Sequence, residues 1–174
     1  MPLDISFSLD DQDLDYFRSV MKKAQHRAEA LSEAAVVESA HKLLRKVDDN
    51  SRAPHFVRER LVHLQSLISM LDDADWPLAA EERTDVISAL AYFAHPSDII
   101  DDNVPVLGLL DDAIMIDLVV REMRNEVDAY EAFCRYRSEQ ETLQGKDVTR
   151  EDWLAAKRRE LFDRMRERRS RRHR

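Results

Sequence analysis

The chain has 174 residues, a formal net charge of −8, 36% charged side chains and only two glycines, Gly108 and Gly145. Its length suits one medium-sized domain with an extension. Two isolated glycines exclude the glycine-rich phosphate loop, the three-glycine dinucleotide fingerprint and the glycine-flanked serine elbow, because each needs several glycines close together.

The composition indicates an all-α protein. Glycine and proline are sparse and only 7% of residues are aromatic, whereas β-sandwiches need many turn residues. Cys134 is the one cysteine, so the fold contains no internal disulfide. The N-terminus lacks the basic start and apolar run of a secretion signal, and the apolar stretch 104–120 contains three aspartates. We therefore expect a cytoplasmic protein without a membrane span.

Four stripes of apolar residues at helical spacing precede residue 96, over residues 14–31, 36–47, 57–71 and 86–93. Ser8 or Asp10 can cap the first helix. The second stripe is rotated from the first, so the chain either breaks near Ser32 or forms one long helix with two neighbours. Pro54 and Pro77 open the third and fourth helices, and the fourth stops before Pro96.

The clearest periodicity predicts a central helix near 108–137. Its apolar residues are spaced four, three, four and three from Leu109 to Cys134. The half before Arg121 also has apolar residues on its other faces, so we expect neighbours to surround it. The sequence thus predicts a compact bundle of five to six helices around this element.

A linker is expected over residues 138–148, which include Gly145. Thr149 and Asp152 form a capping-box pattern, so a last helix should begin there, and its apolar residues end before the arginine run. We expect the final residues to be disordered. The predicted organisation is a helical domain over residues 1–137, the linker, and a C-terminal helical arm with a basic tail over residues 149–174.

An acidic turn joins the fourth helix to the central one, with five aspartates and no basic residue between residues 96 and 112. The segment 91–122 resembles the YkvA-type family, a bacterial domain of unknown function. The resemblance is carried by Pro96, Asp98, Ile99, Ile100, Asp102, Pro105, Val106, Leu107, Gly108, Leu110, Asp111 and Asp112. Asp101 stands where the family usually has a second proline. The resemblance implies a compact helical domain, sometimes found beside membrane segments, and no particular reaction.

These carboxylates support two interpretations. In the first, they accept backbone N–H groups and tie the turn to helix starts. In the second, they bind Mg²⁺ or Ca²⁺ beside His95, and the protein is a metal-dependent hydrolase. Their order matches no calcium loop, so the first interpretation is favoured and no cofactor is expected. The candidate site residues are Asp98, Asp101, Asp102, Asp111 and Asp112.

The C-terminus is basic although the rest of the chain is acidic. Ten basic and three acidic residues lie between residues 157 and 174. This tail can fold back on the acidic body, or it can bind nucleic acid or an anionic membrane, such as the inner face of the cell membrane. The candidate anion-binding residues are Arg164, Arg166, Arg168, Arg169, Arg171, Arg172 and Arg174.

No arrangement of residues identifies a catalytic group. The histidines lack zinc-site spacing, and Cys134 lies on an apolar stripe. We therefore expect a non-enzymatic protein-interaction or adaptor module that binds a partner or a second copy of itself. Binding of anionic surfaces through the tail and metal-dependent hydrolysis are the alternatives.

Overall fold

A computed structural model describes residues 6, 8–49, 53–94, 100, 104, 107–144 and 150–172. Within these ranges the chain forms seven α-helices and two short 3₁₀ helices, without a strand. The all-α prediction is confirmed for this part of the chain. None of these helices combines the length and the hydropathy needed to cross a membrane.

The first four helices largely follow the predicted stripes. They are α1 (Asp11–Ala28), α2 (Glu33–Asp48), α3 (His55–Asp72) and α4 (Ala80–Leu90), and the 3₁₀ helix η1 (Ala91–Ala94) follows them. Asp10 caps α1 by accepting the N–H groups of Gln12 and Asp13. The chain does break at Ser32, whose hydroxyl accepts the Ala35 N–H and caps α2.

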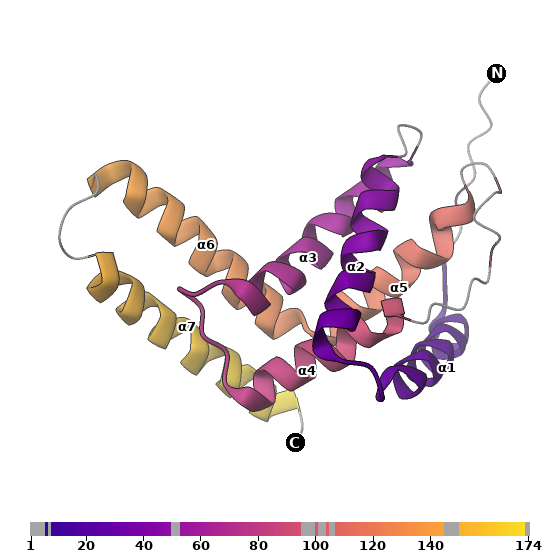
Figure 1. Cartoon of the computed structure of the whole chain (residues 1–174), viewed down its shortest axis with the longest axis horizontal. Coiled ribbons are helices and arrows are strands. Elements are labelled where there is room, and N and C mark those ends of the chain that lie inside the picture. The colour runs from indigo at the N-terminus through magenta and orange to yellow at the C-terminus, as the bar shows by residue number, and fades with distance from the viewer. Residues whose placement is uncertain are drawn as a thin grey trace.

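The predicted central helix is two helices. The 3₁₀ helix η2 (Leu107–Leu109) leads into α5 (Leu110–Glu122), and α6 (Arg124–Gln144) runs in a different direction in Figure 1. Met123 lies between them with φ −98° and ψ 21°, outside the α-helical region. The prediction of one continuous helix near 108–137 is wrong here, and α6 also extends beyond residue 137 into the predicted linker.

The bend at Met123 is stabilised from the far end of the chain. Breaking a helix leaves the last carbonyl groups of its first half without helical partners. Arg172 Nη1 lies 3.3 Å from the carbonyl oxygen of Arg121 and 3.2 Å from that of Glu122, and donates to both. A basic side chain at a helix C-terminus also complements the helix dipole.

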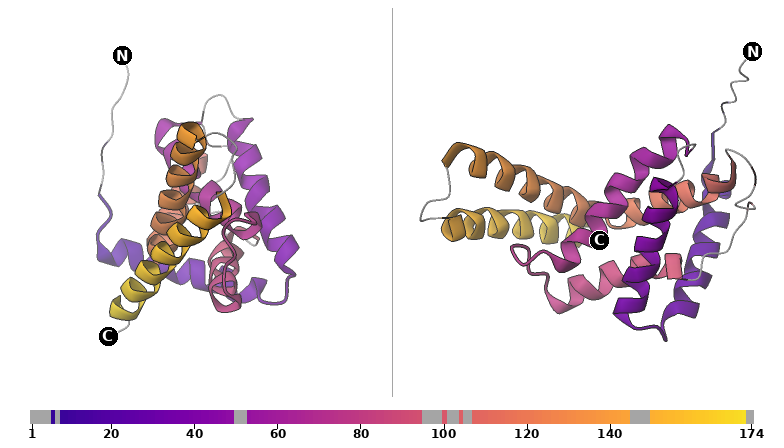
Figure 2. Two further views of the ribbon diagram at one scale, coloured as in Figure 1. Left: turned by 90° about the vertical axis from the view of Figure 1, so that its left-hand side faces the viewer. Right: turned by 45° about the horizontal axis from the view of Figure 1, so that its top comes forward.

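The last helix is longer than the sequence predicts. Helix α7 (Arg150–Arg172) continues through the arginine run, so the expectation of a disordered tail is wrong up to Arg172. Figures 1 and 2 show α6 and α7 side by side and antiparallel, projecting from the bundle of α1 to α5. We call this pair of helices the arm.

The core of the bundle lies between α3 and α5. Leu64 and Leu67 of α3 are buried, as are Met115, Ile116 and Val119 of α5. Neighbours surround α5 as predicted, because α1, α3 and α4 all pack against it. The same apolar core continues to the base of the arm, where Phe133 of α6 and Leu154 of α7 are buried.

Candidate functional site

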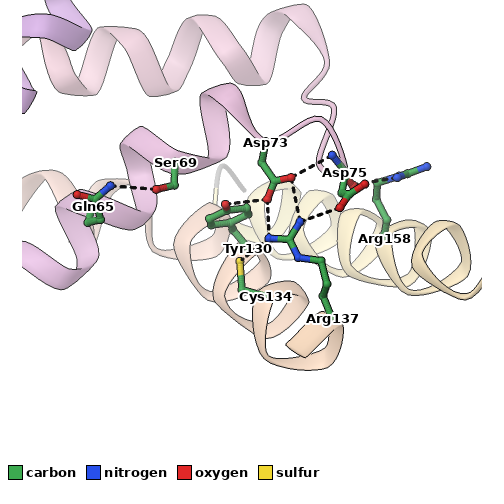
Figure 3. Close-up of polar contacts among 8 residues, drawn as sticks. All are labelled: Gln65, Ser69, Asp73, Asp75, Tyr130, Cys134, Arg137 and Arg158. Carbon is green, nitrogen blue, oxygen red and sulfur yellow. Dashed lines mark hydrogen bonds and ion pairs between the residues drawn. The ribbon is translucent and has the colours of Figure 1, made fainter. Parts of the chain in front are cut away.

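Asp73, which follows the last residue of α3, is the centre of a polar cluster at the base of the arm. Its carboxylate accepts the Tyr130 hydroxyl at 2.9 Å and Arg137 Nη1 at 3.0 Å, and Arg137 Nη2 lies 2.9 Å from its second oxygen. Figure 3 shows the guanidinium group and the phenol converging on this one carboxylate. A forked arginine–carboxylate pair fixes orientation as well as distance.

Asp75 extends this contact to α7. Arg137 Nη1 lies 3.0 Å from its carboxylate, and Arg158 Nη1 donates to its carbonyl oxygen at 2.9 Å. The Asp75 N–H in turn donates to Asp73 Oδ1 at 3.0 Å. We call Asp73, Asp75, Tyr130, Arg137 and Arg158 the Asp73 cluster. It ties the connection between α3 and α4 to both helices of the arm.

The protonation states of the side chains in and beside this cluster favour a structural role over a catalytic one. Burial favours the neutral form of Asp73, but hydrogen bonds from Arg137 and Tyr130 outweigh it and hold the pKa below its usual 3.8. Burial and the Asp73 carboxylate raise the pKa of Tyr130. Burial also raises the pKa of the Cys134 thiol. Both groups are therefore protonated at neutral pH, the opposite of an activated nucleophile.

Trp76 lies next to the Asp73 cluster and packs against aromatic rings of both arm helices. Its side chain is 1% exposed and stacks on Phe162 of α7 at a centroid distance of 4.3 Å. Phe133 of α6 lies 5.0 Å away and Tyr130 lies 5.8 Å away. The loop between α3 and α4 thus places one aromatic ring between the two helices of the arm.

A serine, a histidine and a glutamate also meet between α3 and α6. Ser66 Oγ lies 3.0 Å from Glu131 Oε1, and His63 Nδ1 lies 2.9 Å from the same oxygen. In a hydrolytic triad the histidine stands between the nucleophile and the acid. Here the serine and the histidine both contact the carboxylate of Glu131, and Ser66 Oγ also donates to the Val62 carbonyl oxygen. This order does not activate a serine.

A second cluster joins the inner face of the arginine run to α4 and to the start of α6. Arg166 Nε lies 2.7 Å from Glu82 Oε1, and Arg169 pairs with Asp85 of the same helix, α4. Arg169 also lies 3.7 Å from the buried carboxylate of Glu126. We call Glu82, Asp85, Glu126, Arg166 and Arg169 the Glu82 cluster.

Two buried carboxylates of the Glu82 cluster differ in their pKa. Burial raises the pKa of Glu82, but the hydrogen bonds from Arg166 and the Ala79 N–H outweigh it, and the net pKa is below 4.5. Glu126 has a pKa above 4.5, chiefly because of burial, against which Arg169 acts only partly. The ionised form of Glu82 is thus stabilised by its hydrogen-bond partners, whereas burial makes ionisation of Glu126 unfavourable.

Three other arginines of the run face away from the body, whereas Arg172 contacts the carbonyl groups at the bend after α5. Arg164, which is largely exposed, pairs with Glu160 one turn earlier at 2.6 Å, and Arg171 pairs with Glu167. Arg168 is exposed on the same side. Arg174 lies outside the described residues.

Two of the five predicted acidic site residues are described. Asp111 Oδ2 accepts the Ile100 N–H at 3.1 Å, and its Oδ1 accepts the Asp112 N–H at 3.1 Å. Lys46 Nζ lies 3.9 Å from Asp112. Across the residues that the structure describes, no three histidine, cysteine or acidic side chains are grouped as metal ligands. Asp98, Asp101, Asp102 and His95 lie outside those residues.

The sequence did not point to the Asp73 cluster. Residues 72–76 resemble an ordinary polar connection, and Tyr130 belongs to an apolar stripe. Asp73 and Arg137 are 64 residues apart, so no local pattern links them. One signal was available: Tyr130 and Arg137 are seven residues apart and therefore share one face of a helix.

Comparison with known proteins gives one match. Residues 84–118, about a fifth of the chain, match the family model described as "Protein of unknown function (DUF1232)". This match includes most of α4 and most of α5 and supports an uncharacterised domain over this segment, but it does not confirm the YkvA name. The chain matches no curated protein and no solved structure.

Proposed function

We propose that the chain is a non-enzymatic protein-interaction module and that its arm carries the binding surface. The observation that carries this proposal is the arm itself, two paired helices that project from the bundle in Figures 1 and 2. The Asp73 cluster and Trp76 hold its base in a fixed position. A surface held in its bound conformation loses less conformational entropy on binding, which favours affinity.

The outer part of the arm offers a surface that the bundle does not use. Leu143, near the end of α6, is 78% exposed, and Arg135 and Glu139 are exposed on the same helix. A partner that buries this leucine removes apolar surface from water, which favours binding.

Site-specific photo-crosslinking tests the proposal. A photoreactive phenylalanine analogue replaces Leu143 in one protein and Val62 in a control, because Val62 of α3 is also exposed, at 63%, but lies on the bundle. In extracts of the native cells we expect a discrete adduct from position 143 and none of the same mass from position 62. Identical adducts from both positions, or none from position 143, would contradict the proposal.

A second candidate function is binding of an anionic surface through the outer face of α7. It is favoured by the division of the arginine run: Arg166 and Arg169 are bound to carboxylates of the body, whereas Arg164, Arg168 and Arg171 face outward. The acidic neighbours Glu160 and Glu167 weaken this outer face, which makes it the second candidate.

Salt-dependent binding tests this second candidate. The variant R164Q/R168Q/R171Q is compared with the unmodified chain on duplex DNA and on vesicles containing phosphatidylserine. Binding through the outer face should fall steeply as salt rises and should be lost in the variant. DNA and vesicles are separate arms, so the result also identifies the surface. Binding that is insensitive to salt, or unchanged in the variant, would contradict this function.

A further inference from the structure

A polar cavity lies where the end of α7 meets α4 and the bend between α5 and α6. Its volume is about 320 Å³, within the usual range of roughly 300–1,000 Å³ for small-molecule sites. Side chains from α1, α4, the bend and the last turns of α7 line it. The polar part of this lining includes Gln25, Asp85, Ser88, Asn125, Glu126 and Arg169.

The Glu82 cluster, which contributes to this lining, has one carboxylate more than it has arginines. Arg166 pairs with Glu82, and Arg169 pairs with Asp85. The third carboxylate belongs to Glu126, and Arg169 Nη1 lies 3.7 Å from its Oε1. This separation is beyond the usual length of a hydrogen bond. The two arginines therefore do not fully compensate the three carboxylates.

Glu126 is the carboxylate with the weakest compensation, and it lines the cavity. Its side chain is 5% exposed. Within the described residues, the one hydrogen bond to this carboxylate comes from its own backbone N–H. An ionised carboxylate has about four acceptor positions, and its burial is costly when they are not used. Glu126 can therefore accept further hydrogen bonds from a group inside the cavity.

The other polar groups of the lining favour a cation over an anion. The donors of Arg169 are directed to Asp85, and Arg172 donates to the carbonyl groups at the bend. Ser88 and Asn125 provide a hydroxyl and an amide oxygen that can accept hydrogen bonds. An anion would have to compete with carboxylates and carbonyl groups for the arginines, whereas a cation would meet acceptors.

An organic ammonium group suits these acceptors better than a metal ion. Hard metal ions need several oxygen ligands at short, defined distances. No histidine, cysteine or acidic side chains form such a group of three in the part of the chain that the structure describes. An ammonium group has three donors and does not require a fixed ligand geometry.

We propose that this cavity binds a small organic cation with a primary ammonium group, and that Glu126 accepts a hydrogen bond from this ammonium. A cavity of about 150 Å³ already accommodates benzene, so a cavity of about 320 Å³ has room for an ammonium group and a short carbon chain. Ala89 and Met123 provide apolar contacts for that chain. The site does not include the arm surface around Leu143, so it is independent of the proposed protein-interaction function.

An NMR titration of the full chain with n-butylamine tests this site. The amine is charged at pH 7, and n-butanol is its neutral counterpart of equal length. We expect n-butylamine to shift the backbone amide signals of Ser88 and Asn125 until they saturate, and n-butanol to shift them much less. Equal shifts from both compounds, or no saturable shift with n-butylamine, would overturn the proposal.

Two variants with the same change of charge identify the group that binds the ammonium. Glu126→Gln keeps the shape of the side chain but removes its charge, and should weaken binding of n-butylamine by about tenfold or more. Asp128→Asn is the control, because Asp128 lies on the same helix but pairs with Arg124 outside the cavity. Thermal melts establish that both variants are folded.

The control variant should bind n-butylamine like the unmodified chain. Equal weakening in the two variants would mean that the amine responds only to the net charge of the chain, and would contradict the role of Glu126. Inorganic phosphate is titrated separately. If phosphate shifts the signals of Ser88 and Asn125 and n-butylamine does not, the arginines select an anion and the proposal fails.

Discussion

Arg137 joins α6 to the connection between α3 and α4, more than 60 residues away in sequence, and its removal should be costly. Replacing it by Met keeps the aliphatic part of the side chain but leaves Asp73, whose side chain is 11% exposed, without its cation. Breaking a buried ion pair costs about 3–5 kcal/mol. We expect Arg137→Met to lower the free energy of unfolding by an amount in this range, measured by chemical denaturation.

The control for this change is Arg135→Met on the same helix. Arg135 is exposed, and exposed substitutions usually change stability by less than about 0.5 kcal/mol. Similar losses for the two variants would mean that the Asp73 cluster does not stabilise the arm.

Glu126 and Glu82 should respond to pH with opposite signs. The pKa of Glu126 is above 4.5 in the folded protein, so its ionisation opposes folding at neutral pH and the penalty disappears as pH falls through that pKa. Glu126→Gln should therefore raise the melting temperature at pH 7 but not at pH 4.

Glu82 provides the opposite case. Its folded pKa is below 4.5, so its ion pair with Arg166 stabilises the protein above pH 4.5 and is lost as pH falls below that value. Glu82→Gln should lower the melting temperature at pH 7 and have less effect in acid. Thermal melts of both variants across this pH range are the measurement. If the melting temperatures of the two variants change in the same direction at pH 7, burial does not control the pKa of Glu126.

Among the helices, α7 shows how tertiary contacts override local composition. The capping-box pattern located its start, but the arginine run resembled a solvated tail. Like charges in a row disfavour an isolated helix. In the fold, Arg166 and Arg169 are offset by carboxylates of α4, and Arg172 donates to the carbonyl groups exposed at the bend between α5 and α6. In the sequence, the α4 carboxylates lie 84 residues from Arg166 and Arg169, and the carbonyl groups lie about 50 residues from Arg172. No local sequence pattern could therefore show these contacts.

The sequence did not predict the bend at Met123, for a related reason. The apolar spacing continues through it without a glycine or proline, and a periodic pattern records which face is buried, not whether the axis is straight. Both flanking hydrogen bonds, Met123 N–H to Val119 and Val127 N–H to Met123, are still made at 3.0 Å. The change of direction therefore depends on packing rather than on local preference.

Two pairs of substitutions with equal charge change should separate the faces of α7. R166Q/R169Q removes the contacts to Glu82 and Asp85, whereas R164Q/R168Q alters the outer face. We expect the first pair alone to lower the melting temperature and to speed amide hydrogen exchange near the end of α7. Equal effects from both pairs would show that the run acts only through its net charge.

At the scale of the whole molecule, the arm and the bundle share one core through Trp76. The sequence indicated an extension after residue 148, but the apolar face of that extension, including Leu154 and Phe162, belongs to the same buried core as α3 and α5. A ring contributed by the α3–α4 loop and enclosed by both arm helices couples their folding. We therefore expect the unmodified chain to unfold in one transition.

Trp76→Leu should weaken this coupling specifically. Truncating a buried aromatic side chain leaves a cavity; replacement by alanine costs about 3–5 kcal/mol, and leucine leaves a smaller cavity and so costs less. The variant retains Trp153, whose ring lies 5.5 Å from Tyr136 within the arm, so its fluorescence reports on the arm while circular dichroism reports on all helices. We expect the fluorescence transition of Trp76→Leu to occur at lower denaturant concentration than the circular dichroism transition. In the control Trp153→Phe, where Trp76 reports on the base of the arm, the two transitions should coincide. If they also coincide in Trp76→Leu, the Asp73 cluster couples arm and bundle without the tryptophan.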